Sequence, residues 1–266
     1  MEPEGKLALV GTYIGISADA WGLVFGAIQT TAVVAALAFG VSQLGIVQRQ
    51  RSADSLAAMH KEWREIESEA MFLLYEVPIF RGDLDGRALQ LIDWIALCAD
   101  QDSPASEAER EACGNFFKHA PLVINALSNL TAYMENSALR EQDLLAQMST
   151  RIMEVHYVLE PYLLLVSFSR QSRWGLRVRR LGIGAVSYYI RSDVQSKHGL
   201  DMRGIDVLPV LRDSISGFPE KNWRRKSYIP KMSQCAERDR QDIQRLGEYA
   251  SQRADWERVA ELLRKV

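Results

Sequence analysis

The sequence predicts an all-α protein: one N-terminal transmembrane helix, then a cytosolic helical bundle and a C-terminal helix. Residues 21–47 carry no charge, and apolar residues after them recur every three or four positions. No stretch alternates polar and apolar residues for long enough to predict a sheet. The predicted parts are an extracytoplasmic N-terminus, the transmembrane helix, a cytosolic domain, a basic linker and a C-terminal helix, at residues 1–19, 20–47, 48–216, 217–231 and 232–266.

The uncharged segment is long enough to cross a bilayer as a helix, which needs ~20 mainly apolar residues. Between residues 21 and 41 the only polar members are Gln29, Thr30 and Thr31. One alternative is a buried core helix, although soluble helices rarely run this long without a charge. A cleaved signal peptide is another, but the 20 residues ahead of the segment have a net charge of −2 where a positive region is expected.

Flanking basic residues predict the orientation. Lys6 alone precedes the span, whereas Arg49, Arg51, Lys61 and Arg64 follow it closely. Because the flank richer in Lys and Arg stays in the cytosol, we expect a single-pass protein of the cell membrane. Its N-terminus would lie outside and its C-terminal domain in the cytoplasm.

Small residues share one face of the predicted span. At about 100° per residue, five residues fall within about 40° of one line: Gly22, Gly26, Gln29, Ala36 and Gly40. Small residues let helix backbones approach, and a glutamine in lipid gains by bonding to a partner. The stripe therefore predicts a homo-oligomer, although Gly and Ala are also simply common in single spans.

Beyond the span, an apolar stripe from Leu56 to Val77 predicts an amphipathic helix that ends before Pro78. Residues 49–53 contain no Gly or Pro, so the membrane helix can continue into this one. A short helix is expected over 87–99. The tail helix either docks on the bundle or is free for a partner.

Two further helices have recognisable signals. Ser106 and Glu109 fit a capping box at the start of one, and Pro121 is expected to kink or divide it before Met134. The clearest apolar repeat follows at 145–163.

Charge is segregated along the chain. Residues 52–169 have a net charge of −11 and residues 170–231 a net charge of +9. The first interpretation is internal ion pairing between the two segments; the others are contact with anionic lipid headgroups or with nucleic acid. The basic residues in question are Arg170, Arg173, Arg177, Arg179, Arg180, Arg224, Arg225 and Lys226.

No motif predicts catalysis, a cofactor or a metal site. Gly182 and Gly184 lack the third glycine and the preceding strand of a phosphate-binding loop. The four histidines are scattered, and His156 is expected to be a hydrogen-bonded core or boundary residue. The three cysteines have no paired spacing, so we expect reduced, buried thiols. We predict a protein that is not an enzyme.

Part of the chain resembles a known family. The matching pieces are the segments at residues 47–51, 129–136, 141–145 and 159–162, the last ahead of Arg170. They resemble a poorly characterised bacterial family of single-span membrane proteins with an all-helical cytosolic domain. The resemblance implies a membrane-tethered helical module and carries over no catalytic residues. Some bacterial proteins of this outline serve in phage defence.

These observations favour a membrane-anchored, non-enzymatic interaction module that self-associates through its span and binds a protein partner. The first alternative is an oligomeric effector that perturbs the membrane when its cytosolic domain is triggered. The second is a membrane-tethered nucleic-acid binder that uses the basic segment 170–231. Membrane lipid and further copies of the chain are the expected partners in the favoured case.

Overall fold

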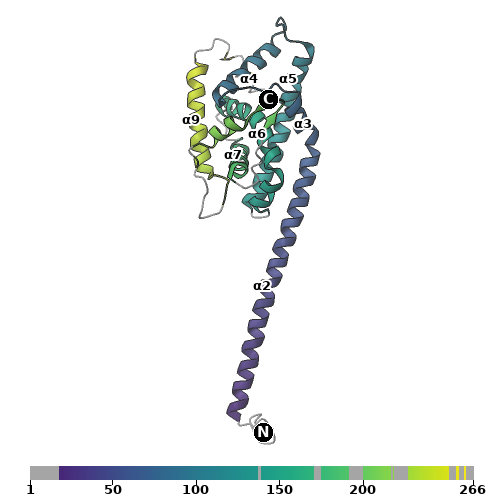
Figure 1. The fold of residues 1–266 in the computed structure, drawn as a ribbon, viewed down its shortest axis with the longest axis vertical. Coiled ribbons are helices and arrows are strands. Elements are labelled where there is room, and N and C mark those ends of the chain that lie inside the picture. The colour runs from purple at the N-terminus through teal and green to yellow at the C-terminus, as the bar shows by residue number, and fades with distance from the viewer. Residues whose placement is uncertain are drawn as a thin grey trace. The chain divides into compact units, whose positions relative to one another are not determined.

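A computed structural model describes residues 18–136, 139–170, 175–191, 200–216, 218, 227–251, 256–257 and 261. The chain divides into two compact units, Met1–Ala53 and Asp54–Val266. Helices make up almost all of the regular structure in the described residues (Figure 1). The predicted all-α class is confirmed.

Helix α2 covers Ala18–Glu65, so it begins in the first unit and ends in the second. The helix continues through residues 49–53, as the absence of Gly and Pro there predicts. Its segment Gln29–Val47 is long and apolar enough to cross a membrane, and none of that segment is buried in the structure.

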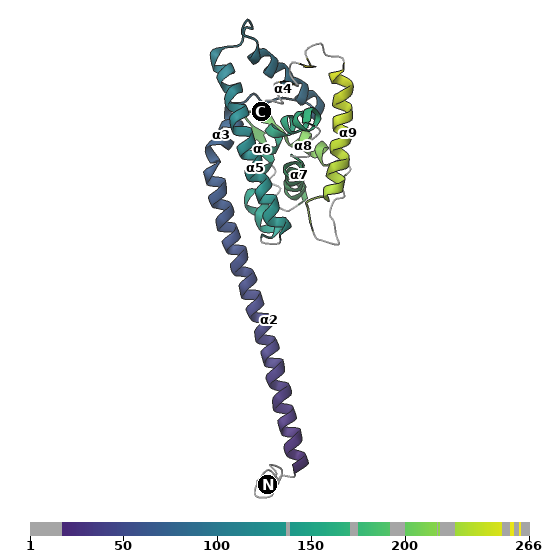
Figure 2. The same ribbon diagram turned by 180° about the vertical axis from the view of Figure 1, so that it is seen from behind.

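The second unit is a bundle built around α6, Glu141–Arg170. Helices α3 (Glu67–Tyr75), α4 (Leu84–Ala99), α7 (Leu176–Arg191) and α9 (Met232–Ala250) pack against α6, and α5 (Glu107–Glu135) lies against α3, α4 and α7. The short α8 is Leu208–Ser214. Figures 1 and 2 show α6 in the middle of this unit, with α9 on one side and α3 and α5 on the other.

Helix α6 is central because its stretch 155–167 is mostly apolar, with buried residues on every side. All residues from 155 to 167 are buried, as expected of a helix that has no solvent face. The Tyr162 ring meets Phe116 of α5 edge-on, with 5.2 Å between ring centroids, and Phe116 meets Trp94 of α4 at 5.9 Å. These contacts join three helices in one core.

The predicted helix signals have mixed outcomes. The capping box is confirmed: the Ser106 hydroxyl accepts a hydrogen bond from the Glu109 amide at 3.2 Å, and the Glu109 carboxylate accepts one from the Ser106 amide at 2.8 Å. Pro121 does not divide its helix, because α5 continues through it. The single stripe from Leu56 to Val77 was also wrong, since α2 ends at Glu65 and α3 begins at Glu67.

A two-stranded hairpin, which the sequence did not predict, follows α7. Strand β1 (Asp201–Met202) pairs antiparallel with β2 (Ile205–Asp206). The turn residues Arg203 and Gly204 both have positive φ, 53° and 81°, the conformation that tight hairpin turns require. Arg203 donates to the Tyr75 carbonyl at 2.7 Å and also bonds to the Val77 carbonyl, so the hairpin is tied to the end of α3.

The tail helix is docked. Helix α9 packs on α6 and α7 and buries two acidic residues, Asp239 and Asp242, beside Cys235, Leu246 and Ala250. Of the two arrangements that the sequence left open for this helix, the docked one is observed.

Helices α6 and α7 approach closely at Gly182. A Cβ atom at this position would lie 2.2 Å from Cγ of the His156 ring, well inside van der Waals contact. His156 is itself fully buried, so its ring has little room to move. Gly182 therefore allows α6 and α7 to pack closely, and Gly184 makes room in the same way for Ile229 in the segment before α9.

We expect Gly182→Ala to lower the free energy of unfolding by roughly 1–3 kcal/mol, because the added methyl overpacks a closed interior. Gly114→Ala on α5 is the matched control, since nothing lies within 4 Å of its Cβ position. It should raise stability by up to about 1 kcal/mol through helix propensity. Urea unfolding of the detergent-purified chain, followed by tryptophan fluorescence, measures both. Equal effects of the two changes would contradict the packing argument.

Candidate functional site

The site begins with a proline inside the central helix. Pro161 has no N–H, so the carbonyl of Tyr157, four residues earlier, loses its partner within α6. Arg87 of α4 supplies the missing donor: its Nη1 donates to the Tyr157 carbonyl oxygen at 2.7 Å. The Arg87 guanidinium also lies over the Tyr157 ring, 4.2 Å from its centroid. The missing backbone hydrogen bond at Pro161 is thus replaced by one from the buried guanidinium of Arg87.

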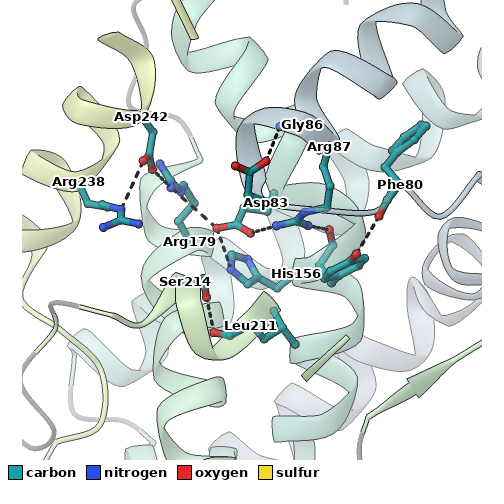
Figure 3. A network of polar contacts seen from close by, with 12 residues as sticks. Phe80, Asp83, Gly86, Arg87, His156, Arg179, Leu211, Ser214, Arg238 and Asp242 are labelled. Atoms are coloured by element: carbon teal, nitrogen blue, oxygen red, sulfur yellow. Dashed lines mark hydrogen bonds and ion pairs between the residues drawn. The ribbon is translucent and has the colours of Figure 1, made fainter. Parts of the chain in front are cut away.

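Glu160 provides the countercharge. Arg87 Nη2 donates to Glu160 Oε2 at 2.7 Å, and Arg179 Nη2 of α7 lies 3.9 Å from Glu160 Oε1. The side chains of Glu160, Arg87 and Arg179 are only 2%, 1% and 4% exposed. Figure 3 shows Arg87, Arg179 and His156 converging on this place inside the domain.

Arg179 carries the ion pairs on to the tail helix. Its Nη1 donates to Asp239 at 2.6 Å, and its Nη2 bonds to Asp242. Both aspartates belong to α9, so this helix is attached to the bundle by buried charges as well as by apolar contacts. Each of these carboxylates would be costly to bury without the guanidinium.

Two outer arginines complete the arrangement around Asp242. Arg245 pairs with Asp242 at 2.5 Å and with Asp85 of α4 at 3.0 Å, and Arg238 lies 3.4 Å from Asp242. Arg245 and Arg238 are half-buried, at 46% and 33% side-chain exposure. The network therefore runs from the interior of the domain to its surface.

His156 lies one turn before Glu160 and is fully buried. The expectation of a core histidine is confirmed, but neither ring nitrogen has a hydrogen-bond partner among the described residues. Its Nε2 atom is 3.7 Å from Glu160 Oε1.

Burial and charge set the ionisation of this cluster. Burial lowers the pKa of His156 to about 4, more than Glu160 offsets, so the ring is neutral at pH 7. Burial alone would raise the pKa of Glu160, but the charge that His156 gains when it is protonated in acid and the permanent charges of Arg87 and Arg179 outweigh burial and hold that pKa at about 2. Glu160 is therefore the ionised centre of the network.

A pocket of about 410 Å³ opens beside this network. Its walls come from the start of α4 and from α6, α7, α8 and α9. Four arginines, five carboxylates and a few other residues line it: Arg87, Arg179, Arg238, Arg245, Asp83, Asp85, Glu160, Asp213, Asp242, Leu84, Val210, Ser214 and Tyr249. A volume of this size suits a small molecule.

The basic residues singled out in the sequence divide into three groups. Arg179 is buried in the network, where it cannot reach a lipid headgroup or nucleic acid. Arg177 and Arg180 both pair with Glu135 of α5, at 3.5 and 2.5 Å. The Arg170 side chain and the whole of Arg173, Arg224, Arg225 and Lys226 lie outside the described residues.

The observed ion pairs agree with the first interpretation of the segregated charge, which is internal pairing between the acidic segment 52–169 and the basic segment 170–231. The Glu135 and Glu160 carboxylates of the acidic segment meet arginines of the basic segment within one domain.

The predicted self-association residues all belong to α2. Gln29, Ala36 and Gly40 are exposed in the structure. Nothing lies within 4 Å of the Cβ position of Gly40, so this position is open to a close neighbour. The surroundings of Gly22 and Gly26 lie outside the described residues.

No group of three His, Cys, Asp or Glu side chains is arranged to hold a metal ion in the described part of the chain. The cysteines are free thiols, with Cys113 and Cys235 buried and Cys98 half-buried. Burial raises the pKa of Cys113 to about 12 and that of Cys235 to about 11. These two thiols are therefore poor nucleophiles at neutral pH.

No family model, curated protein or solved structure matches this chain. No family model therefore supports the resemblance to a bacterial single-span family.

We expect stability to fall as the pH is lowered from about 6.5 to about 4. The unfolded chain protonates His156 near pH 6.5, whereas the folded chain does so only near pH 4. Between these values the unfolded state binds the extra proton, and the total loss is about 3 kcal/mol. Urea midpoints at pH 7, 5.5 and 4.5 measure it.

In this titration His156→Leu should flatten the decline, while His60→Gln at an exposed position should leave the decline intact. A decline that survives His156→Leu unchanged would mean that another group is responsible.

Proposed function

We propose that this protein is a membrane-anchored interaction module: one helix holds it in the bilayer, and the helical domain meets its partner in the cytoplasm. The observation that carries the proposal is the exposed apolar surface of Gln29–Val47. Large apolar side chains there, such as Leu37, Phe39 and Val41, are 65–69% exposed. Exposing this apolar surface to water is unfavourable, whereas in a bilayer the same side chains contact apolar lipid tails.

The length of the segment fits the same proposal. Nineteen helical residues extend about 28 Å, close to the ~30 Å hydrocarbon core of a bilayer. The exposed Arg49 follows within two residues of its end, at the place where a basic side chain meets headgroups. The positive flank supports a cytoplasmic location for the domain.

Self-association through the span is the second part of the proposal. Gln29, Ala36 and Gly40 are exposed on α2, and the helix spacing puts them on one line with Gly22 and Gly26. Among lipid tails a small-residue face allows two backbones to pack closely, and Gln29 can bond across the contact.

Contact of the basic segment with nucleic acid has less support. Arg177, Arg179 and Arg180 already meet carboxylates of the same domain, and each pair would have to open before these residues could neutralise a phosphate.

Replacing Gly26 and Gly40 together by leucine should weaken self-association in detergent micelles about tenfold, in line with the 1–2 kcal/mol that such contacts contribute. Ala38→Leu, about 160° around the helix from the stripe, is the matched control and should leave assembly unchanged. Analytical ultracentrifugation measures both.

All variants should remain in the membrane pellet when lysate is centrifuged without detergent. Recovery of the full chain in the supernatant would contradict the anchor. If the Gly26/Gly40 variant stays in the membrane pellet but self-associates in detergent as strongly as the unchanged protein, the small-residue stripe would be contradicted and the membrane anchor would not.

A further inference from the structure

The structure brings together two cysteines whose spacing in the sequence matches no motif. Cys98 lies in the last turn of α4, and Cys113 lies in the second turn of α5. The Cys98 thiol donates a hydrogen bond to the carbonyl oxygen of Glu109 at 3.5 Å. In an α-helix that carbonyl also accepts from the amide four residues later, which here belongs to Cys113. The two thiols share a hydrogen bond as well, so they are in direct contact.

The connection between the two helices holds this contact in place. Nη2 of Arg110 in α5 donates to three backbone carbonyl oxygens at 3.0–3.3 Å, those of Asp100, Gln101 and Ser103. The Ser103 hydroxyl in turn donates to the Leu97 carbonyl in α4. These hydrogen bonds tie the α4–α5 connection to both helices. The cysteines therefore lie side by side in the folded chain, and a reaction between them is intramolecular.

The two thiols differ in access and in acidity. Cys98 is half-buried and its hydrogen bond to Glu109 lies at the exposed surface, whereas Cys113 is buried. Burial raises the pKa of Cys98, but a hydrogen bond from Cys113 and the charge of Arg110 oppose this. Burial also raises the pKa of Cys113, and the neighbouring Cys98 raises it further. Cys98 is therefore the thiol that solvent reaches and that ionises first.

The surroundings of the pair favour redox chemistry over metal binding. No third His, Cys, Asp or Glu side chain joins the two thiols as a metal ligand in the part of the chain that the structure describes, and a structural zinc site needs four ligands. The third cysteine, Cys235, is buried in another apolar cluster with Leu176 and Ile183. It provides a thiol of the same protein with which the pair can be compared.

We propose that Cys98 and Cys113 form a redox-active dithiol, which a small disulfide oxidises to an intramolecular disulfide. The Cys98 thiolate attacks one sulfur of the small disulfide, so that its S–S bond breaks and one thiolate leaves. Cys113 then loses its proton to solvent and attacks the Cys98 sulfur, which releases the second thiolate. The two cysteines are thereby oxidised, and the small disulfide is reduced to two thiols. The protons that the cysteines lose pass through solvent to the released thiolates.

The disulfide joins the end of α4 to the start of α5 by a covalent bond. In a reducing compartment the pair stays as two thiols, whereas an excess of oxidised small disulfide closes it. Membrane anchoring requires no such chemistry, so the pair adds a response to oxidants to the helical domain.

Oxidised glutathione, a small disulfide, is the probe. The freshly reduced full chain in detergent is incubated with it, remaining thiols are alkylated, and tryptic peptides are analysed by mass spectrometry without reduction. Trypsin cuts after Arg110, between the two cysteines. The expected product is therefore a disulfide-linked pair of the peptides 88–110 and 111–118, with Cys235 alkylated. Dithiothreitol should separate the pair again.

The variants distinguish the two roles. Cys98→Ser should abolish the linked peptides. Cys113→Ala should leave a mixed disulfide of Cys98 with glutathione that lives about a hundredfold longer than in the unchanged protein, because no neighbouring thiol attacks it. Cys235→Ala is the matched control and should form the linked peptides as the unchanged protein does.

Three results would each overturn the proposal. The first is a folded chain in which Cys98 and Cys113 are both alkylated after the incubation. The second is a mixed disulfide at Cys98 that persists in the unchanged protein as long as in Cys113→Ala. The third is a disulfide that involves Cys235 or joins two chains in place of the linked peptides.

Discussion

The described domain depends on one ionised carboxylate, Glu160, in the fully buried stretch of its central helix, α6. Helix α6 has no solvent face in this stretch, so Glu160 cannot be hydrated and must find its counterions inside the protein. Arg87 from α4 and Arg179 from α7 provide them, and Arg179 in turn holds two aspartates of α9. Glu160 thus pairs with arginines of α4 and α7, and Arg179 extends the same ion network to α9.

This arrangement restricts how the helices can pack. A purely apolar interface tolerates sliding and repacking as long as volume is kept. A buried ion network does not, because a displaced partner leaves an uncompensated charge. Pro161 adds a second fixed point, since the freed Tyr157 carbonyl accepts from the same Arg87 that neutralises Glu160.

The sequence was informative wherever local rules decide structure. The helical class, the Ser106 cap and the presence of one apolar helix long enough to cross a membrane each follow from spacing or composition. The sequence was misleading at Ile66, where the apolar stripe continues but the helix stops, and it left open a division at Pro121 that does not occur, because α5 continues through that residue. The hairpin at Arg203 was missed because a non-glycine residue takes the first positive-φ position.

The candidate site lay largely beyond sequence reasoning, since Arg87, Glu160 and Arg179 are far apart in the chain and each resembles an ordinary surface residue. The available signal was an acidic residue directly before a proline, inside the strongest apolar repeat. A buried carboxylate next to a carbonyl that lacks its helical donor needs a cationic hydrogen-bond donor. Only the folded structure shows that this donor is Arg87. In the sequence Arg179 was one of eight basic residues, for which internal ion pairing, lipid contact and nucleic-acid contact were all open, and nothing there distinguished it from the others.

A double-mutant cycle on Arg87 and Glu160 tests the central claim most directly. Arg87→Met and Glu160→Gln should each lower the free energy of unfolding by about 3–5 kcal/mol, because each leaves a buried charge or dipole unmatched. The double variant should lose clearly less than the sum, whereas the exposed pair Arg240 and Glu237 should couple by less than about 1 kcal/mol. Strictly additive losses at Arg87 and Glu160 would contradict the claim that this ion pair organises the domain.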